Sequence, residues 1–261
     1  MIIDTHTHIG RNEKFQGVKQ LLESMDKAKI DKALVFASNV GDCPNEYLLQ
    51  EIAPHKDRLY GVARFDGEIG YKNHGVREWA NRTRDWHGEN KIVAVKFYTG
   101  YEHYYPIDKS TFLTHLSSIG CPAIFHSGDC LAGETKAKLK YAHPIHIDEV
   151  AVDFPNMKFI IAHMGFPWVI DAAEVCYKNA NVYADMSGFV YGEFLAPDFY
   201  KFTKMIQEFI DICPSDKLMF GSDWPISNQA SYISAINKNF VDQENIMCKT
   251  AEKVFKLSAR C

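Results

Sequence analysis

Short apolar runs recur eight times along the chain, and segments with helical spacing of apolar residues separate them. The runs have the length of strands and are rich in β-branched and aromatic residues. They cover residues 2–9, 32–40, 59–65, 92–98, 122–127, 158–163, 182–187 and 218–222. Alternation of strands with helices favours parallel β/α units, and eight such units make a closed barrel. The sequence therefore predicts an α/β fold of the (β/α)8, or TIM-barrel, type.

The length of 261 residues agrees with this fold, since α/β barrels of about this size form one domain. We therefore expect residues 1–261 to form a single domain. An open, doubly wound sheet is the alternative architecture. The Gly-rich G-x-G-x-x-G turn of that fold is missing after the first run, which favours the barrel.

Charge and composition narrow the range of partners. Hydrophobic residues make up 46% of the chain and charged residues 24%, as in ordinary globular proteins. The 29 Lys and Arg residues against 33 Asp and Glu residues give a net charge of -4. Nucleic acid and anionic membranes are therefore not expected as main partners, because no basic field would attract them. We expect a small-molecule substrate, and the oligomeric state stays open, with a homodimer as one option.

Several features predict a cytoplasmic protein. The longest apolar stretches are as short as strands, whereas a membrane-spanning helix needs about 20 apolar residues. The first residues lack the basic start and apolar run of a signal peptide. The seven cysteines are an odd number without a C-x-x-C pair, which is typical of reduced thiols.

The first run contains two histidines, His6 and His8, that are spaced for one face of a strand. Because residues two apart in a strand point to the same side, both imidazoles can face the interior of a barrel. Such a pair is suited to bind a metal ion. Asp4 lies on the same face, one layer deeper, where it could support the two ligands. The alternative is a polar strand end that is exposed to water.

Three further polar residues stand at or near the ends of later runs: His126 lies near the end of the fifth, His163 ends the sixth, and Asp223 follows the eighth. The carboxyl ends of all barrel strands meet at one rim, so these side chains should lie close to the histidine pair. Separate hydrogen-bonded core residues are the alternative. Buried polar groups are unfavourable unless they are satisfied, and one divalent cation would satisfy several of them. The arrangement therefore favours a metal site.

Lys96 is the polar residue on the interior face of the fourth run, between Ala94 and Tyr98. Three interpretations stay open. Its ammonium group could neutralise a substrate carboxylate, or the lysine could be carboxylated and bridge two metal ions. The third option is a lysine that extends to the barrel mouth without a chemical role.

Aromatic residues follow several runs and are candidates for substrate binding. Tyr98, Tyr101 and His103 belong to the segment after the fourth run, and Trp224 follows the eighth. Aromatic walls suit a planar or cyclic substrate. The alternative is a tyrosine-rich lid that packs on itself. Strand register, which the sequence leaves open, decides whether Arg64 and Asp185 also face the interior.

These motifs, in this order, resemble the amidohydrolase superfamily. The residues that carry the resemblance are Asp4-x-His6-x-His8, His126, Ala162-His163-Met164-Gly165 and Gly221-Ser222-Asp223-Trp224-Pro225. The similarity is greatest to the amidohydrolase-2 branch, which includes aminocarboxymuconate semialdehyde decarboxylase and related decarboxylases and hydrolases. Segments 146–151, 154–155, 181–188 and 251–257 also fit this branch, so the resemblance spans nearly the whole chain.

The resemblance implies a metal site and its ligands. His6, His8, His126 and Asp223 would bind one Zn²⁺, with Mn²⁺ or a second ion as alternatives, and His163 would be a neighbouring catalytic group. The DNase-like branch of the superfamily has Glu at the position of Lys96, which argues against that branch. Phosphotriesterase- and urease-like members carry a carboxylated Lys there. The residues around Lys96 look more like the amidohydrolase-2 branch, so we expect one ion.

The expected activity is hydrolysis of a C–O or C–N bond, for example in a lactone or amide. Zinc lowers the pKa of a bound water from about 15.7 to about 7. Asp223 would accept a proton from water and return it to the leaving group, His163 would polarise the substrate carbonyl, and Lys96 would bind a carboxylate. The alternative is non-oxidative decarboxylation of a small aromatic acid. A binding protein without catalytic activity is a third interpretation, and the intact ligand set argues against it.

Overall fold

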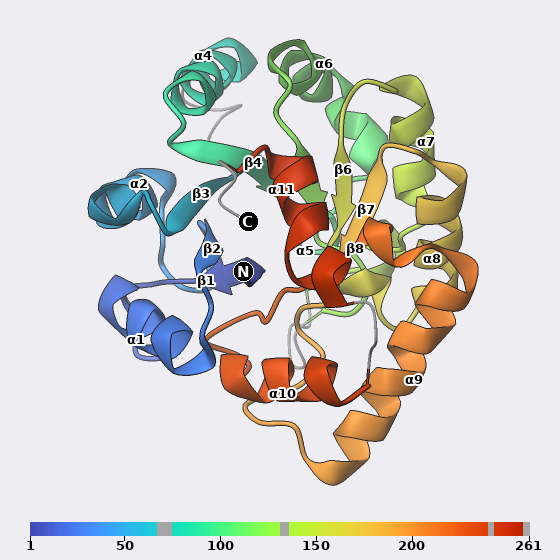
Figure 1. Cartoon of the computed structure of the whole chain (residues 1–261). Helices are drawn as coiled ribbons and strands as arrows, with labels where there is room; N and C mark the ends of the chain where they lie inside the picture. Colours follow the sequence, from blue (N-terminus) through green and yellow to red (C-terminus); the bar gives the residue numbers. More distant parts are fainter. Residues whose placement is uncertain (67–74, 131–135, 240–242, 258–261) are drawn as a thin grey trace.

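The computed structural model describes residues 1–66, 75–130, 136–239 and 243–257 (Figure 1). Eight parallel strands follow one another around a single sheet in chain order. They are β1 (Ile3–His8), β2 (Lys32–Phe36), β3 (Leu59–Arg64), β4 (Ile92–Phe97), β5 (Ala123–Phe125), β6 (Phe159–Ile161), β7 (Val182–Asp185) and β8 (Leu218–Met219). Each strand lies within one of the eight runs, so the predicted (β/α)8 barrel is confirmed.

The strands are shorter than the apolar runs that contain them, mainly at the carboxyl ends. Run 158–163, for example, continues as strand only to Ile161, and His163 then takes a left-handed backbone conformation with φ of 60°. Asp223, after β8, has φ of 67°. The residues just beyond these strands therefore leave the hydrogen-bonded ladder and turn their side chains over the barrel end.

The first and last strands close the barrel through backbone hydrogen bonds. The Thr5 amide donates to the Phe220 carbonyl at 2.9 Å, and the Asp223 amide donates to the His6 carbonyl at 2.8 Å. The His8 amide donates to the Trp224 carbonyl at 2.7 Å. Closure brings the start of the chain into contact with residues more than 200 positions away.

Helices surround the ring of strands (Figure 1). They are α1 (Val18–Ala28), α2 (Asn45–Ile52), α4 (Gly75–Gly88), α5 (Thr99–Glu102), α6 (Ser110–Ile119), α7 (His146–Asp153), α8 (Val169–Lys178), α9 (Ala196–Ile212), α10 (Gln229–Asn239) and α11 (Thr250–Phe255). Helix α1 shows why they form: Val18, Leu21 and Met25 recur at helical spacing and are buried. Among the described residues, no helix combines the length and apolar character needed to cross a membrane. The cytoplasmic location stays a prediction.

The barrel interior changes from apolar to polar along the strands. Leu34, Val62, Ala94 and Ile124 form a buried cluster with residues of α11, which lies across the ring of strands in Figure 1. Two residues further along, each on the same face as the apolar residue before it, stand the polar side chains Arg64, Lys96 and His126. The interior is therefore sealed at one end and polar at the other.

Candidate functional site

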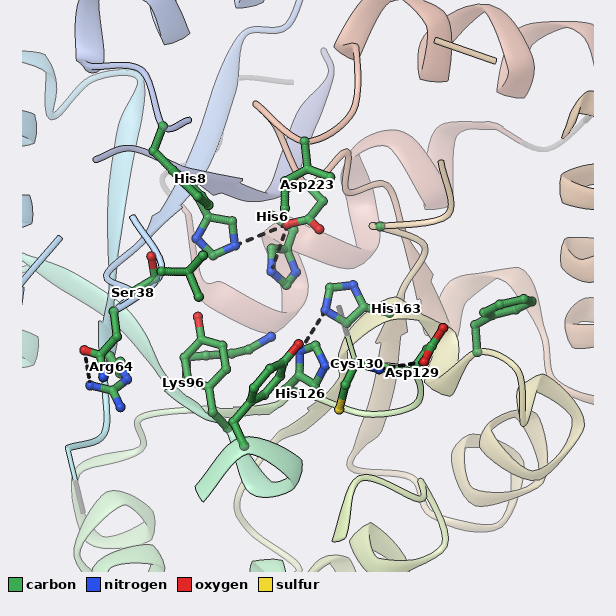
Figure 2. Close-up of a pocket in the computed structure, with 18 of the residues that line it drawn as sticks. His6, His8, Ser38, Arg64, Lys96, His126, Asp129, Cys130, His163 and Asp223 are labelled. Atoms are coloured by element: carbon green, nitrogen blue, oxygen red, sulfur yellow. Dashed lines mark hydrogen bonds and ion pairs between the residues drawn. The ribbon is translucent and has the colours of Figure 1, made fainter. Parts of the chain in front are cut away.

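A cavity of about 490 Å³ opens at the carboxyl ends of the strands. Figure 2 shows how side chains from different strands point into it. Its polar part is lined by His6, His8, Arg64, Lys96, His126, His163 and Asp223. Its apolar part is lined by Phe15, Tyr98, Tyr101, Phe166, Phe189, Tyr191 and Ile226. The size and composition suit a small organic molecule.

His6, His8 and Asp223 form a compact group whose ligand atoms lie within 4.8 Å of one another. Asp223 Oδ1 is 3.2 Å from His8 Nε2 and 3.8 Å from His6 Nε2. All three residues are buried, yet Asp223 Oδ1 has no well-aligned hydrogen bond within the described part of the chain. A buried carboxylate oxygen beside two imidazole nitrogens is a typical arrangement for a divalent cation, so these residues fit a metal ion.

The protonation states in this group also suit a metal. Burial, together with the positive charge of Lys96, lowers the pKa of His6 to about 4, although Asp185 and Asp223 raise it. Burial alone would raise the pKa of Asp223, but the close contact with His8 and the nearby histidines lower it below its ordinary value. Near neutral pH the group therefore offers a neutral His6 imidazole and an ionised carboxylate, the forms that bind metal.

His126 lies beside the group but makes its closest contact elsewhere. Its Nδ1 is 3.1 Å from His163 Nε2, and its Nε2 is 2.9 Å from the Asp129 carbonyl oxygen. Two ring nitrogens this close need a proton or a cation between them, because their lone pairs would otherwise repel. Of the four expected ligands, the structure thus gathers His6, His8 and Asp223 in one group and pairs His126 with His163.

Asp185, the last residue of β7, and Ser187, two residues later, are central to the site, although sequence reasoning left Asp185 open and did not single out Ser187. Asp185 Oδ2 is 3.1 Å from His6 Nδ1, and Asp185 Oδ1 accepts a hydrogen bond from the Ser187 hydroxyl. Burial would raise the pKa of Asp185, but His6, His163 and Lys96 lower it below the usual range. The position of Asp185 at the end of an apolar strand was the available signal in the sequence. It was not enough, because the sequence leaves the strand register open and with it the face to which Asp185 points.

Asp4, on the same face of β1 as His6 and His8, is bound to residues that follow β8. It accepts hydrogen bonds from the Ser222 amide at 2.9 Å, the Ser222 hydroxyl at 2.6 Å and Gln229 Nε2 at 2.8 Å. Burial raises its pKa to about 6, although these hydrogen bonds lower it. The carboxyl group thereby holds the residue before Asp223 against β1.

Lys96 is fully buried and extends into the polar part of the cavity. Its Nζ has no hydrogen-bond partner among the described residues, and it lies 5.3 Å from the ring centre of Phe36 and 5.4 Å from that of Tyr98. Burial lowers its pKa from 10.5 to about 8, while Asp185 and Asp223 raise it. The structure therefore places an unpaired amine where an anionic group of a ligand could bind.

Arg64, another cation that lines the cavity, already has partners. Its guanidinium donates to Asn39 Oδ1 at 2.6 Å and forms a close ion pair with Glu102. It also lies 5.7 Å from the ring centre of Tyr98. Arg64 therefore faces the interior, and it is bound to α5 and the loop after β2.

The aromatic residues divide into two sets. Tyr98 and Tyr101 line the cavity and pack near His126, whose ring centre is 6.0 Å and 5.0 Å from theirs. His103 is exposed and is not among the lining residues, because the left-handed turn at the end of α5 directs it to the Lys136 carbonyl. Trp224 is 6% exposed and packs in the hydrophobic core. Its carbonyl accepts the hydrogen bond from the His8 amide that helps to close the barrel. His103 and Trp224 therefore lie outside the set of residues that line this cavity, and the structure does not support their predicted contact with substrate.

Gly188 gives the site a specific test. Its φ is +74°, and an added Cβ would lie 2.8 Å from His163 Nδ1 and 3.2 Å from Asp223 Oδ2. Gly188→Ala should displace these side chains and weaken zinc binding about 10–100-fold, as judged by competition with a chelator. Gly192→Ala is the matched control, because Gly192 has φ of +73° and an added Cβ meets nothing within 4 Å. Equal zinc affinities of the two variants would show that the close approach at Gly188 is unimportant.

A closed β/α barrel with histidines and aspartates at its carboxyl rim is the architecture of metal-dependent barrel enzymes. A sequence profile described as amidohydrolase, of the amidohydrolase-2 type, matches residues 3–257. The chain therefore belongs to the amidohydrolase family, as its motifs predicted.

One curated relative is Protein fluG of Emericella nidulans, which is 24% identical over 146 residues. The match covers 53% of this chain, and the chain spans only 16% of the length of that relative.

Solved structures share the fold at low sequence identity. An amidohydrolase from Burkholderia multivorans with bound zinc has a TM-score of 0.73 at 15% identity, covering 98% of this chain and 99% of that one. A probable 2-pyrone-4,6-dicarboxylic acid hydrolase from Acinetobacter baumannii has a TM-score of 0.70 at 17% identity, with coverage of 98% and 99%. A 5-carboxyvanillate decarboxylase from Novosphingobium aromaticivorans, complexed with manganese, has a TM-score of 0.71 at 14% identity, with coverage of 98% and 96%.

Proposed function

We propose that this protein is a metal-dependent hydrolase that cleaves a C–O or C–N bond of a small molecule such as a lactone or an amide. The observation that carries the proposal is the buried group of His6, His8 and Asp223, whose ligand atoms converge in a cavity of substrate size. Family membership and the bound zinc of one structural neighbour support it. The aromatic walls favour a planar or cyclic substrate.

The proposed metal ligands are His6, His8, Asp223 and His126, and the proposed ion is a single Zn²⁺. Imidazole and carboxylate ligands without thiolates suit zinc, and they also suit manganese. When bound, such an ion would supply Lewis acidity for the substrate and for a nucleophilic water. A second ion is the alternative, because His126 Nδ1 and His163 Nε2 form a separate pair of nitrogens 3.1 Å apart.

The other side chains have distinct proposed tasks. Asp223, ionised and facing the cavity, accepts a proton from the attacking water and returns it to the leaving group. The His163 ring lines the cavity, where it can polarise the substrate carbonyl. Lys96 binds a carboxylate of the substrate, and Tyr98 and Tyr101 enclose the ring.

Non-oxidative decarboxylation of a small aromatic acid is the second candidate. The observation that favours it is the buried, unpaired amine of Lys96 inside an aromatic cavity, which would suit the carboxylate of such an acid. In this reaction the C–C bond to the substrate carboxylate breaks, CO2 leaves, and the ring carbon takes up a proton in its place, so no attacking water is needed. The decarboxylase among the structural neighbours supports this candidate.

A substrate panel separates the two activities. Zinc- and manganese-loaded protein is assayed with lactones and amides, monitored by acid release, and with 2-hydroxybenzoate-type acids, monitored by CO2 release. We expect hydrolysis of at least one lactone or amide and no CO2. Release of CO2 without any hydrolysis would replace the first candidate by the second.

Metal content is the most direct measurement on the site. We expect about one zinc per chain in purified, zinc-supplemented protein, measured by elemental mass spectrometry, and a loss of turnover after chelation that added zinc restores. Two ions per chain would instead favour carboxylated Lys96 as a bridge. Protein that binds no zinc after supplementation would contradict the proposed site.

A further inference from the structure

Two of the cations that line the cavity leave neighbouring strands at the same level (Figure 2). Arg64, the last residue of β3, is the ladder partner of Lys96 in β4. Neighbouring strands lie about 4.8 Å apart. The guanidinium carbon of Arg64 is 5.7 Å from the ring centre of Tyr98, and Lys96 Nζ is 5.4 Å from it. A cyclic ligand that packs beside Tyr98 is therefore close to both cations.

The two cations differ in how their charges are balanced. Lys96 Nζ has no hydrogen-bond partner among the described residues. The guanidinium group of Arg64 donates to Asn39 and forms a close ion pair with Glu102. A second carboxylate, that of Asp66, lies 3.9 Å from Arg64 Nη1. The protein itself therefore balances the charge of Arg64, and of these two cations it is Lys96 that is left for a ligand.

Helix α5 fixes the position of Glu102 at the cavity wall. The Glu102 amide donates to the Tyr98 carbonyl at 3.0 Å, which closes one helical turn directly after β4. Residues four apart in a helix lie on the same side, and both Tyr98 and Glu102 line the cavity. The side chains of Glu102 and Arg64 are 17% and 12% exposed, so solvent screens their charges only in part. An anionic group of the protein thus lies at the wall next to Lys96.

The wall formed by Arg64 and Glu102 discriminates between charged and neutral groups of a ligand. A ligand carboxylate placed there would meet the like charge of Glu102, and juxtaposed like charges oppose binding strongly. A hydroxyl or amide group has a proton to donate, and Glu102 Oε2 is a buried acceptor without a partner among the described residues. Asp129 and Lys136 also line the cavity, but they are exposed and opposite in sign. The wall therefore favours a neutral group.

We propose that Glu102 is a specificity-determining residue. Through its ion pair with Arg64, it restricts the cavity to cyclic substrates that carry a single carboxylate, bound by Lys96, and a neutral hydrogen-bonding group next to it. This inference rests on the proposed function, in which Lys96 binds a carboxylate of the substrate. It holds whether the bond that is cleaved is C–O, C–N or C–C, because it concerns binding and not the reacting bond.

The first test compares two ligands that differ in one charge. Benzene-1,3-dicarboxylate carries two carboxylates, and 3-carbamoylbenzoate has a neutral amide of nearly the same shape in place of one of them. NMR titrations of 15N-labelled, zinc-supplemented protein at pH 7 and low salt measure both affinities. We expect 3-carbamoylbenzoate to bind about 10-fold more tightly. Equal or tighter binding of the dicarboxylate, or no binding of either acid at millimolar concentration, would overturn the proposal.

The second test is Glu102→Gln, which keeps the size of the side chain and leaves Arg64 without its closest ionic partner. The affinity for the dicarboxylate relative to 3-carbamoylbenzoate should rise about 10-fold. Glu46→Gln is the matched control, because it breaks the ion pair of Glu46 with Arg82, and neither residue is among those that line this cavity. The control should keep the wild-type ratio. An unchanged ratio in Glu102→Gln would show that Glu102 does not set the specificity.

Failure of this inference is distinguishable from failure of the proposed function, because both tests measure binding and not turnover. Protein that hydrolyses a lactone or amide but prefers the dicarboxylate would keep the function and reject the role of Glu102. Protein that shows the expected preference but hydrolyses none of the lactones and amides would keep the role of Glu102 and reject the hydrolase. The wild-type comparison also stands if Glu102→Gln does not fold.

Discussion

Asp223→Asn should lower turnover of whichever lactone or amide the wild-type protein hydrolyses by about 10⁴-fold, with the barrel still folded. General acid–base catalysis alone accounts for about 10²–10⁴-fold, and the lost negative charge also weakens metal binding. Asn is the suitable replacement because the backbone at this position has φ of 67°, a conformation that Asn tolerates better than Ala. Steady-state kinetics with saturating zinc measure the effect.

Asp42→Asn is the control for this substitution. Asp42 also has a left-handed backbone, with φ of 50°, but its exposed side chain pairs with Arg11 outside the polar cavity. It should retain wild-type turnover. His163→Asn, at φ of 60°, should also abolish most turnover. Wild-type turnover in Asp223→Asn would contradict the proposed role of the carboxylate, and wild-type turnover in His163→Asn would remove His163 from the mechanism.

Lys96→Met should make the metal-free protein more stable and the enzyme less active. The fully buried ammonium group has no hydrogen-bond partner in the described structure. Lowering the pKa of Lys96 from 10.5 to about 8 by burial corresponds to a penalty of about 3 kcal/mol in the free energy of unfolding. Asp185 and Asp223 lose a cationic neighbour in the variant, so we expect a gain of about 1–3 kcal/mol at pH 7.

Lys96→Met should also remove a pH dependence of the free energy of unfolding, and the sign of that dependence can be stated. Between pH 8 and pH 10.5 the unfolded lysine still binds its proton while the folded lysine has released it. The contribution of Lys96 to stability is therefore unfavourable below pH 8 and disappears as the pH rises to 10.5. Urea unfolding of metal-free protein should show this rise in the wild type, and Lys96→Met should lack it.

Lys19→Met controls for a general effect of losing a surface lysine. The Lys19 side chain is 81% exposed, and its removal should change stability by about 0.5 kcal/mol or less. Turnover of a carboxylate-bearing substrate should fall in Lys96→Met and stay unchanged in Lys19→Met. A Lys96→Met protein that is less stable than the wild type would show that the ammonium group has a favourable partner.

The aromatic residues show why part of the site could not be predicted from the sequence. Tyr98 follows β4 directly and keeps the alternation of the strand, so its place in the cavity was predictable. His103 stands five residues further on, after a helical turn that ends in a left-handed residue. That turn directs its ring to the Lys136 carbonyl, and local patterns in the sequence do not encode such a direction.

His126 is a similar case at the centre of the site. The sequence placed it at the rim with the other histidines, and the structure agrees. Its partner, however, is His163, which the left-handed backbone after β6 brings within 3.1 Å. Which ring nitrogens face each other depends on these loop conformations and on the stagger of neighbouring strands.

The amino-acid sequence by itself determined the eight strands, their parallel order and the rim at which His6, His8, Lys96, His126 and Asp223 meet. Strand periodicity and chain order are local properties, and they suffice for this because every barrel strand delivers its carboxyl end to the same face. Only the tertiary structure decided that Asp185 and Ser187 hold His6 across 179 and 181 positions of sequence. Such contacts arise from barrel closure and strand register, which depend on the packing of the whole chain.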